Sequence, residues 1–374
     1  MTRISYTGAA IFDGTRLHHD AALIVAGGRV LGIGPPEGDR VELPRGTLAP
    51  GFLDLQVNGA GGIAVDGTTD QAALEHICAT QARLGATGCL PTLISDSAEA
   101  TTHVLRAGIA AARARIPGFL GLHLEGPHLD PRRKGAHDAR LLRPMSSADL
   151  ETLVDAAAQL PTLMLTVAPE AATPAQIGTL ARAGVIVSLG HSDCTDAKAA
   201  AAFAAGARAV THLFNAMSQL SSRAPGLVGA ALASDAACGL IADGIHVAPT
   251  ALRVALAARP EGMFLVSDCM AIAGTEMTEM TLGQRRILRR DGRLTLADGT
   301  LAGADLTLPR AIGYLVNEVG LPAPRALAMA SATPARIIGR ADTLGHLAPG
   351  RGADFVHLGP DWSLQGVWRA GQRL

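Results

Sequence analysis

The sequence of 374 residues lacks an excess of charge of either sign, because 32 basic residues are balanced by 33 acidic ones. A formal net charge of -1 provides no basic field that would hold nucleic acid or an anionic membrane. No apolar run is long enough to span a membrane, and the N-terminus, MTRISYTGAAIFDG, lacks the charged start and apolar core of a signal peptide. We therefore expect a cytoplasmic protein without nucleic-acid or membrane partners.

Cysteine is also scarce. The five cysteines are scattered along the chain, and no two of them form a Cys-x-x-Cys spacing. An odd number without this spacing argues against both a disulfide framework and a thiolate zinc site, and it fits a reducing compartment. Apolar residues nevertheless make up 48% of the chain, which indicates a folded globular protein with a large core.

The two ends of the chain resemble each other more than they resemble the middle. The first fifty residues are short β-type runs with Gly-rich turns, among them AGGR, which suits a tight hairpin. The tail, GHLAPGRGADFVHLGPDWSLQGVWRAGQRL, returns to similar runs. We therefore predict a small β-sandwich domain built from residues 1–50 and 347–374, and a second domain over 51–346.

In the middle of the chain, short β-like runs alternate with Ala-rich helical stretches, which is typical of βα units and a parallel sheet. The number and length of these units predict a (β/α)8 barrel of the TIM type, with a doubly wound sheet as the alternative. After the eighth strand, RRILRRDGRLTLADGTLAG predicts a hairpin insertion, and a helical pair is expected over 305–339. The eight candidate strands cover 52–58, 88–94, 119–125, 163–169, 185–191, 209–215, 238–244 and 263–269.

Polar side chains end several of these strands, where barrel enzymes carry their reactive groups. Glu125 closes an apolar run on the third strand, and His191 and His212 lie in the last part of the fifth and sixth strands. One carboxylate and two histidines are the three protein ligands typical of a catalytic zinc. Taken singly, each histidine could be a structural residue, and Glu125 could form a salt bridge with Arg132 or Lys134. Together the three favour a metal site.

Two further residues each have a structural and a chemical interpretation. Asp268, near the end of the eighth strand in LVSDCM, is either an N-cap or a carboxylate that shuttles a proton. His137 lies in the polar loop DPRRKGAHDARLL, where a histidine by itself is most simply a solvated side chain.

Segments spread along the chain carry a resemblance to a known family. They are APGFLDLQVNGAGG, HLEGPHLDPRRKGAHD, LGHSD, THLFNAM, APGLVGA, IADGIHV, LVSDCM and LAGADLTL. In this order they resemble the N-acetylglucosamine-6-phosphate deacetylase family of the amidohydrolase superfamily, from about residue 8 to the C-terminus. HLEGP, THLFNAM and ADGIHV are the segments that point to this activity within the superfamily.

The resemblance implies a metal-dependent hydrolase of amino sugar catabolism. It would remove the N-acetyl group of N-acetylglucosamine 6-phosphate and release glucosamine 6-phosphate and acetate. One divalent metal ion per subunit would be held by Glu125, His191 and His212; zinc is expected first, and iron, cobalt or manganese also suit these ligands. Asp268 would be the general base and then the general acid, and His137 would contact the acetamido carbonyl or the sugar.

The same resemblance implies how the substrate phosphate is bound. Asn215, the backbone at Ala216, and His246 would bind it, with Arg223 reaching in from the neighbouring subunit of a homodimer. A guanidinium suits this role because it offers phosphate a planar fork of donors.

The first strand departs from the wider superfamily. Many members carry a His-x-His pair there, whereas this chain has Gln56-Val57-Asn58. Amides are poorer ligands than imidazole for a tightly held transition metal, so we expect a single metal. Gln56 is then either close to the metal or purely structural.

Three alternatives stay open from the sequence. An enzyme of the same mechanism could act on N-acetylgalactosamine 6-phosphate, which differs at one sugar hydroxyl. A cyclic-amide hydrolase of the dihydroorotase type would leave His246 and Arg223 without a phosphate to bind. A catalytically silent barrel that serves as a scaffold would not need the Glu-His-His-Asp set.

Overall fold

The computed structural model describes residues 2–283 and 285–374. The chain divides into two compact units, each of which is assembled from separate stretches of sequence. One unit contains Met1–Asp54, Thr80–Gly88 and Thr307–Leu374, and the other contains Leu55–Ala79 and Cys89–Leu306.

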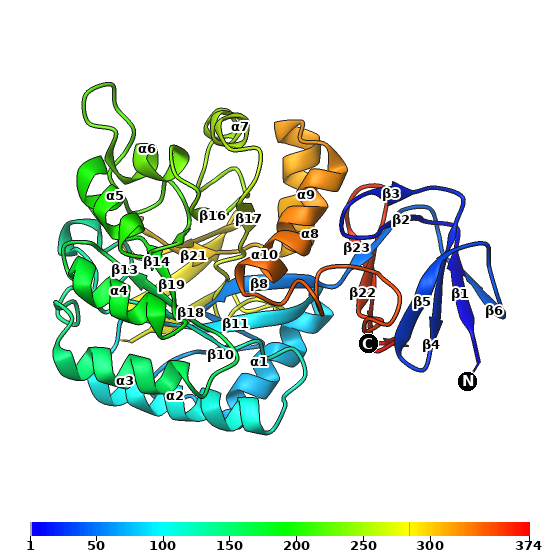
Figure 1. The fold of residues 1–374 in the computed structure, drawn as a ribbon, viewed down its shortest axis with the longest axis horizontal. Coiled ribbons are helices and arrows are strands. Elements are labelled where there is room, and N and C mark those ends of the chain that lie inside the picture. Colours follow the sequence, from blue (N-terminus) through cyan, green and yellow to red (C-terminus); the bar gives the residue numbers. More distant parts are fainter. Residues whose placement is uncertain (1, 284) are drawn as a thin grey trace. The chain divides into compact units, whose positions relative to one another are not determined.

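Eight parallel strands form the barrel that the sequence predicts (Figure 1). Their order in the sheet follows their order in the chain, so the doubly wound alternative is wrong. The first and last strands close the circle through a bridge between Val57 and Cys269, and the amide of Asp268 donates to the carbonyl of Gln56 at 3.1 Å. The strands are β8 (Phe52–Val57), β11 (Ala86–Ile94), β12 (Leu122–Glu125), β13 (Leu163–Val167), β14 (Ile186–Leu189), β15 (Ala209–Val210), β16 (Ala237–Leu240) and β17 (Met263–Leu265).

Several strands end earlier than predicted. The ladders of β14, β15 and β17 stop two or three residues before His191, His212 and Asp268. These three residues have φ angles of 47°, 30° and 50°, in the left-handed region that cannot continue a β ladder. The backbone is therefore turned out of the sheet at the positions where the sequence predicts chemistry.

Helices follow most of the strands, and α2 to α5 lie outside β11 to β14 in Figure 1. Ser97 caps α2, and Ser146 and Thr173 form capping boxes that begin α3 and α4. Helix α2 lies close to the barrel wall, because a Cβ atom on Gly108 would be 2.4 Å from the side chain of Leu122. The helices are α1 (Gln71–Arg83), α2 (Ala98–Arg113), η1 (Pro131–Arg133), α3 (Ser147–Ala157), α4 (Pro174–Arg182), α5 (Asp196–Ala204), α6 (Gly226–Leu232) and α7 (Pro249–Ala258).

The predicted hairpin insertion is confirmed and is part of a four-stranded antiparallel sheet. Its turn at Asp291 and Gly292 has positive φ angles of 50° and 71°, as a two-residue hairpin turn requires. The amide of Ala304 donates to the carbonyl of Asp268 at 2.8 Å, so the insertion is tied to the end of the barrel. The strands are β18 (Glu279–Leu282), β19 (Arg285–Arg290), β20 (Arg293–Thr295) and β21 (Leu301–Ala304), and a separate short hairpin contains β9 (Gly59–Ala60) and β10 (Ile63–Ala64).

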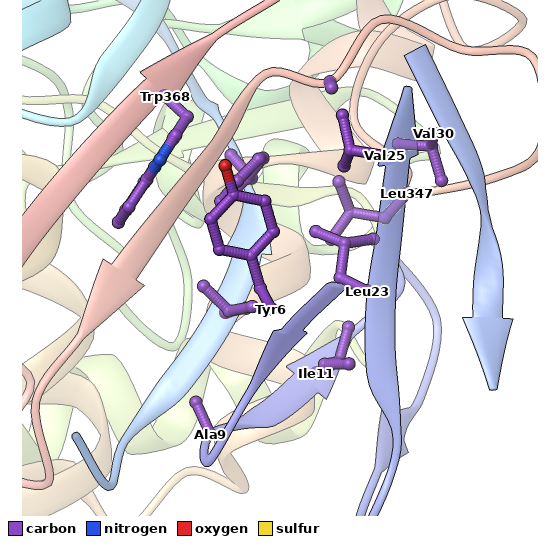
Figure 2. Close-up of a cluster of buried hydrophobic side chains, with 11 residues drawn as sticks. Tyr6, Ala9, Ile11, Leu23, Val25, Val30, Leu347 and Trp368 are labelled. Atoms are coloured by element: carbon purple, nitrogen blue, oxygen red, sulfur yellow. The ribbon is translucent and has the colours of Figure 1, made fainter. Parts of the chain in front are cut away.

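The unit that contains both chain ends has two β-sheets that share one apolar core, as a β-sandwich requires (Figure 2). Strands from both chain ends pair directly, because β7 and β22 are antiparallel neighbours. In the core, Trp368 stacks on Phe355 and Tyr6 meets both rings edge-on. The strands are β1 (Ile4–Thr7), β2 (Ala10–Phe12), β3 (Leu17–His18), β4 (Ala22–Ala26), β5 (Arg29–Gly34), β6 (Asp39–Glu42), β7 (Thr47–Pro50), β22 (Phe355–Leu358), β23 (Leu364–Arg369) and β24 (Gln372–Arg373).

The helical pair expected over 305–339 is wrong in detail. The segment contains α8 (Leu308–Tyr314), which continues as a π-helical turn (Leu315–Val319), then α9 (Ala323–Ala330) and α10 (Ala332–Ile337). Gly320, with φ of 80°, ends the first helical stretch. Over residues 2–283 and 285–374, none of the helices has the length and hydropathy needed to cross a membrane.

Candidate metal and active site

The three predicted metal ligands meet at the mouth of the barrel. Oε1 of Glu125 lies 3.2 Å from Nε2 of His191 and 2.9 Å from Nε2 of His212, and the two histidine nitrogens are 3.1 Å apart. All three side chains are buried. Ligands about 2.0–2.2 Å from a tetrahedral zinc are separated by roughly 3.3 Å, so the three atoms have the spacing of one face of such a site.

The orientation of His191 also suits a ligand. Its Nδ1 atom lies 2.8 Å from the carbonyl oxygen of Arg133, which can only accept, so Nδ1 carries the proton. With its proton on Nδ1, the imidazole would offer the lone pair of Nε2 to an ion held together with Glu125 and His212. A backbone carbonyl that accepts from the other ring nitrogen is a usual partner of a metal-binding histidine.

Histidine neighbours keep the buried carboxylate of this cluster ionised. Burial by itself raises the pKa of Glu125, but the neighbouring His191 and His212 outweigh it and hold the pKa well below the ordinary value. Burial lowers the pKa of His212, whereas its hydrogen bond to Glu125 raises it, and the net shift is upward. The carboxylate is thus ionised and ready to act as a ligand.

The salt-bridge interpretation of Glu125 is wrong. Arg132 instead pairs with Asp130 and Glu170, at 2.5 Å and 3.4 Å. The ammonium of Lys134 lies 3.4 Å from the carbonyl oxygen of Gly135.

Asp268 lies beside this cluster and is held by two amides. Its Oδ1 atom accepts from Nδ2 of Asn58 at 2.7 Å and from Nε2 of Gln56 at 3.1 Å. Gln56 also donates to Oε1 of Glu125 at 3.1 Å. Burial, followed by the negative charge of Glu125, raises the pKa of Asp268 to about 6. Gln56 therefore lies within the cluster.

His137 is buried in the site rather than solvated in its loop. Its Nε2 atom lies 3.8 Å from Oε2 of Glu125, and its ring meets that of His191 edge-on. On the other side of the ring, Nδ1 lies 2.8 Å from the hydroxyl of Ser95. Burial and then the neighbouring His191 lower the pKa of His137 to about 3, which keeps the imidazole neutral.

A pocket of about 380 Å³ opens above these groups. It is lined by the predicted phosphate-binding residues Asn215, Ala216 and His246 as well as by the cluster. Nδ1 of His246 is 2.6 Å from a carboxylate oxygen of Asp243, which leaves the opposite nitrogen available to a ligand. Arg223 is exposed and does not belong to the lining.

A hydrogen-bonded layer lies beneath the cluster. Nδ1 of His123 donates to the carbonyl of Leu55, and Nε2 lies 2.8 Å from the hydroxyl of Thr166. This hydroxyl is 2.6 Å from that of Thr211, which is 2.7 Å from that of Ser188. Thr211 precedes His212 in the chain, so the layer links the barrel interior to one of the predicted metal ligands.

Some residues of the site are absent from the prediction. Ser95 is the first polar residue after β11, so its position at a strand end is a sequence signal for it. Arg133 and the segment Thr300–Gly303 also line the pocket. The strand-end pattern does not mark either of them. Thr300–Gly303 belongs to the insertion, which reaches the barrel mouth only through tertiary packing.

Comparison with known proteins identifies similar chains. A family model described as the amidohydrolase family matches residues 47–374. The chain is 38% identical to an N-acetylgalactosamine-6-phosphate deacetylase from Shewanella sp. (strain ANA-3), over 89% of this chain and 84% of that protein. It is 33% identical to an N-acetylglucosamine-6-phosphate deacetylase from Haemophilus influenzae, over 87% and 86%.

The fold is also similar to that of a solved deacetylase structure. The fold superposes on the crystal structure of N-acetylglucosamine-6-phosphate deacetylase from Pasteurella multocida with a TM-score of 0.95. The identity is 32%, and the match covers 100% of this chain and 99% of that one. An enamidase structure, with 14% identity and a TM-score of 0.63, shares the fold alone.

Proposed function

Because the chain belongs to the amidohydrolase family, we propose that it removes the N-acetyl group of N-acetylglucosamine 6-phosphate. The products are glucosamine 6-phosphate and acetate. The observation that carries this proposal is the convergence of Glu125, His191 and His212 beside Asp268 at the bottom of one pocket. Relatives that bear this enzyme name and cover most of the chain support it.

The donor set suits one divalent metal ion per subunit, with zinc as the first candidate and iron, cobalt or manganese as alternatives. Glu125, His191 and His212 would hold it, since their donor atoms all lie within 4.8 Å of one another. Such an ion, when bound, activates water as a nucleophile and polarises the acyl carbonyl.

Asp268 handles the proton in this reaction. Its Oδ1 atom is engaged by Asn58 and Gln56, so Oδ2 is the oxygen that accepts a proton from the attacking water. The same oxygen returns the proton to the nitrogen, which must leave as an amine. A carboxyl with a raised pKa suits both steps, because it can hold the proton between them.

His137 acts on the other side of the acyl group. Its Nε2 atom faces the cluster from 3.8 Å away, so an N–H there can donate to the carbonyl oxygen as negative charge develops. A neutral imidazole is sufficient for this role, since it needs one donor and no net charge.

The sugar phosphate binds at the outer part of the pocket. His246, Asn215 and the backbone at Ala216 line it there, and binding energy from the phosphate orients the amide for attack. Arg223 completes this site from the neighbouring subunit of a homodimer. Its exposure in the single chain is consistent with a partner across an interface.

N-acetylgalactosamine 6-phosphate is the second candidate substrate. It is favoured by the 38% identity to the Shewanella protein of that name, against 33% to the Haemophilus protein. Parallel measurement of kcat/KM on both epimers decides between them. A higher value on the galacto substrate would replace the first assignment while leaving the mechanism unchanged.

The test of the deacetylase activity is acetate release by purified protein of known metal content. We expect one divalent ion per chain and release of acetate from a sugar phosphate. Treatment with a chelator should remove the ion and abolish acetate release. Hydrolysis of dihydroorotate in preference to either sugar would favour the cyclic-amide alternative. A metal-free protein that releases nothing would favour a scaffold.

Two broader proposals accompany this function. The balanced charge of the chain fits an enzyme of the cytoplasm. The shared core of strands from both chain ends supports a terminal domain of residues 1–50 and 347–374, with a separate catalytic domain of 51–346. Limited proteolysis would test these boundaries.

A further inference from the structure

Ser95 contacts His137 in two ways. Its hydroxyl oxygen lies 2.8 Å from Nδ1 of the imidazole, and its backbone nitrogen lies 3.3 Å from the same atom. Both residues are buried, at 5% and 4% exposure, so bulk water does not replace these contacts. Ser95 directly follows β11 and does not line the pocket, which places it behind the ring.

The backbone contact determines where the imidazole proton is. An amide N–H can only donate, so the Nδ1 atom that it faces must be the acceptor. A proton on Nδ1 would face the donor amide and leave that buried N–H without its bond, which is unfavourable. The backbone amide therefore favours the tautomer that carries its proton on Nε2.

One contact competes with this assignment. The hydroxyl of Ser95 also lies 3.4 Å from the carbonyl oxygen of Glu125, to which it could donate. That contact is longer than the one to Nδ1, and it would still leave the amide N–H of Ser95 facing a protonated nitrogen. The rotatable hydroxyl therefore follows the fixed amide, and both donate to Nδ1.

We propose that Ser95 is a positioning residue that holds His137 as the Nε2–H tautomer and thereby directs its proton into the pocket. This inference rests on the proposed function, because the proton is useful there only if a carbonyl oxygen is the acceptor. Nε2 lies on the side of the ring that faces Glu125, and Ser95 occupies the opposite side. Ser95 thus acts on the substrate through His137.

Nuclear magnetic resonance of the zinc-loaded protein, with ¹⁵N in its histidine rings, tests the tautomer directly. The His137 signals are identified by their absence in His137→Asn. We expect an unprotonated shift for Nδ1 and a protonated shift for Nε2. The reverse pattern in the wild-type protein would overturn the proposal, and this measurement does not depend on the folding of any Ser95 variant.

Three serine variants test the role of the side chain. Ser95→Ala removes the shorter of the two donor contacts and keeps the amide, so the Nδ1–H tautomer should become more populated without replacing the Nε2–H form. We expect kcat to fall about tenfold and KM to change less than about twofold. Ser95→Thr keeps the hydroxyl and should retain the tautomer and most of kcat. Ser97→Ala, which removes the N-cap of α2 in the same loop, is the matched control and should change neither.

The results separate this inference from the proposed function. Unchanged tautomer and unchanged kcat in Ser95→Ala would refute the role of the Ser95 hydroxyl while leaving the deacetylase activity intact. A wild-type protein with the expected tautomer but without acetate release would instead refute the function.

Discussion

Oε1 of Glu125 lies 2.9 Å from Nε2 of His212, although 87 residues separate the two in sequence. Glu125 ends β12 and His212 follows β15. These strands are not neighbours, because β13 and β14 lie between them in the sheet. The contact therefore spans the mouth of the barrel instead of following a ladder. It exists only because the eight strands curve into a closed circle, which directs their C-terminal ends at one point.

Replacement of Asp268 should separate chemistry from metal binding. Asp268→Asn keeps the size of the side chain but removes the proton acceptor, so kcat should fall by about 10²–10⁴-fold. The metal content should stay at the wild-type level, since the carboxylate is not among the three converging ligands. Asp235→Asn, at an exposed position, is the control and should behave as wild type. Loss of the ion together with turnover would show that Asp268 is a ligand.

The raised pKa of Asp268 predicts how stability depends on pH in the metal-free protein. Because burial and Glu125 raise this pKa from 3.8 to about 6, the fold penalises the ionised form. The protonated carboxyl stabilises the fold below about pH 4, and this contribution is lost as the pH rises through about 6.

Metal-free wild type should accordingly become less stable than metal-free Asp268→Asn as the pH rises, by on the order of 2–3 kcal/mol. Thermal unfolding of both proteins between these pH values measures the difference. A stability difference that does not change with pH would contradict the raised pKa.

Gly303 should be intolerant of a side chain. A Cβ atom there would lie 2.6 Å from the Met270 side chain and 2.8 Å from the carbonyl oxygen of Asp268, at a φ of 65°. Gly303→Ala should therefore displace Asp268, lower kcat, and destabilise the protein by about 1–3 kcal/mol.

Gly299 offers a matched control in the same insertion. It also has a positive φ, of 87°, but a Cβ atom would meet nothing within 4 Å. Gly299→Ala should cost about 1 kcal/mol of stability from backbone strain and leave kcat unchanged. Equal effects of the two variants on kcat would show that contact with Asp268 is not the cause.

Arg223 should contribute only to binding of the substrate phosphate. Arg223→Ala is expected to raise KM for the sugar phosphate by about 10–100-fold, because a charged hydrogen bond is lost, and to leave KM for the unphosphorylated sugar unchanged. Arg45→Ala, another exposed arginine, is the control. An unchanged KM in Arg223→Ala would favour the cyclic-amide alternative.

Complementation tests the proposed homodimer. Arg223→Ala and Asp268→Asn subunits are each impaired, but a mixed dimer contains one site with Asp268 from one subunit and Arg223 from the other. Mixing the two variants under conditions of subunit exchange should therefore raise activity above the sum of the parts. Purely additive activity would place Arg223 outside the neighbouring site.

Much of the site follows from local patterns. Glu125, His191 and His212 are recognisable because each lies near the C-terminal end of a predicted strand. The parallel strands of a barrel bring these ends to one face. His137 and Arg223 have no such pattern and were assigned only through resemblance to a family. The structure places His137 in the cluster, whereas the role of Arg223 stays a prediction.

The sequence by itself determined the barrel, the short strands of the chain ends and the hairpin insertion, because periodicity and turn residues are local properties. Only the tertiary structure decided that β14, β15 and β17 end before their polar residues, that β21 reaches Asp268, and that Ser95 lies behind His137. These features depend on distances between segments far apart in the chain, which packing sets and which no local pattern records.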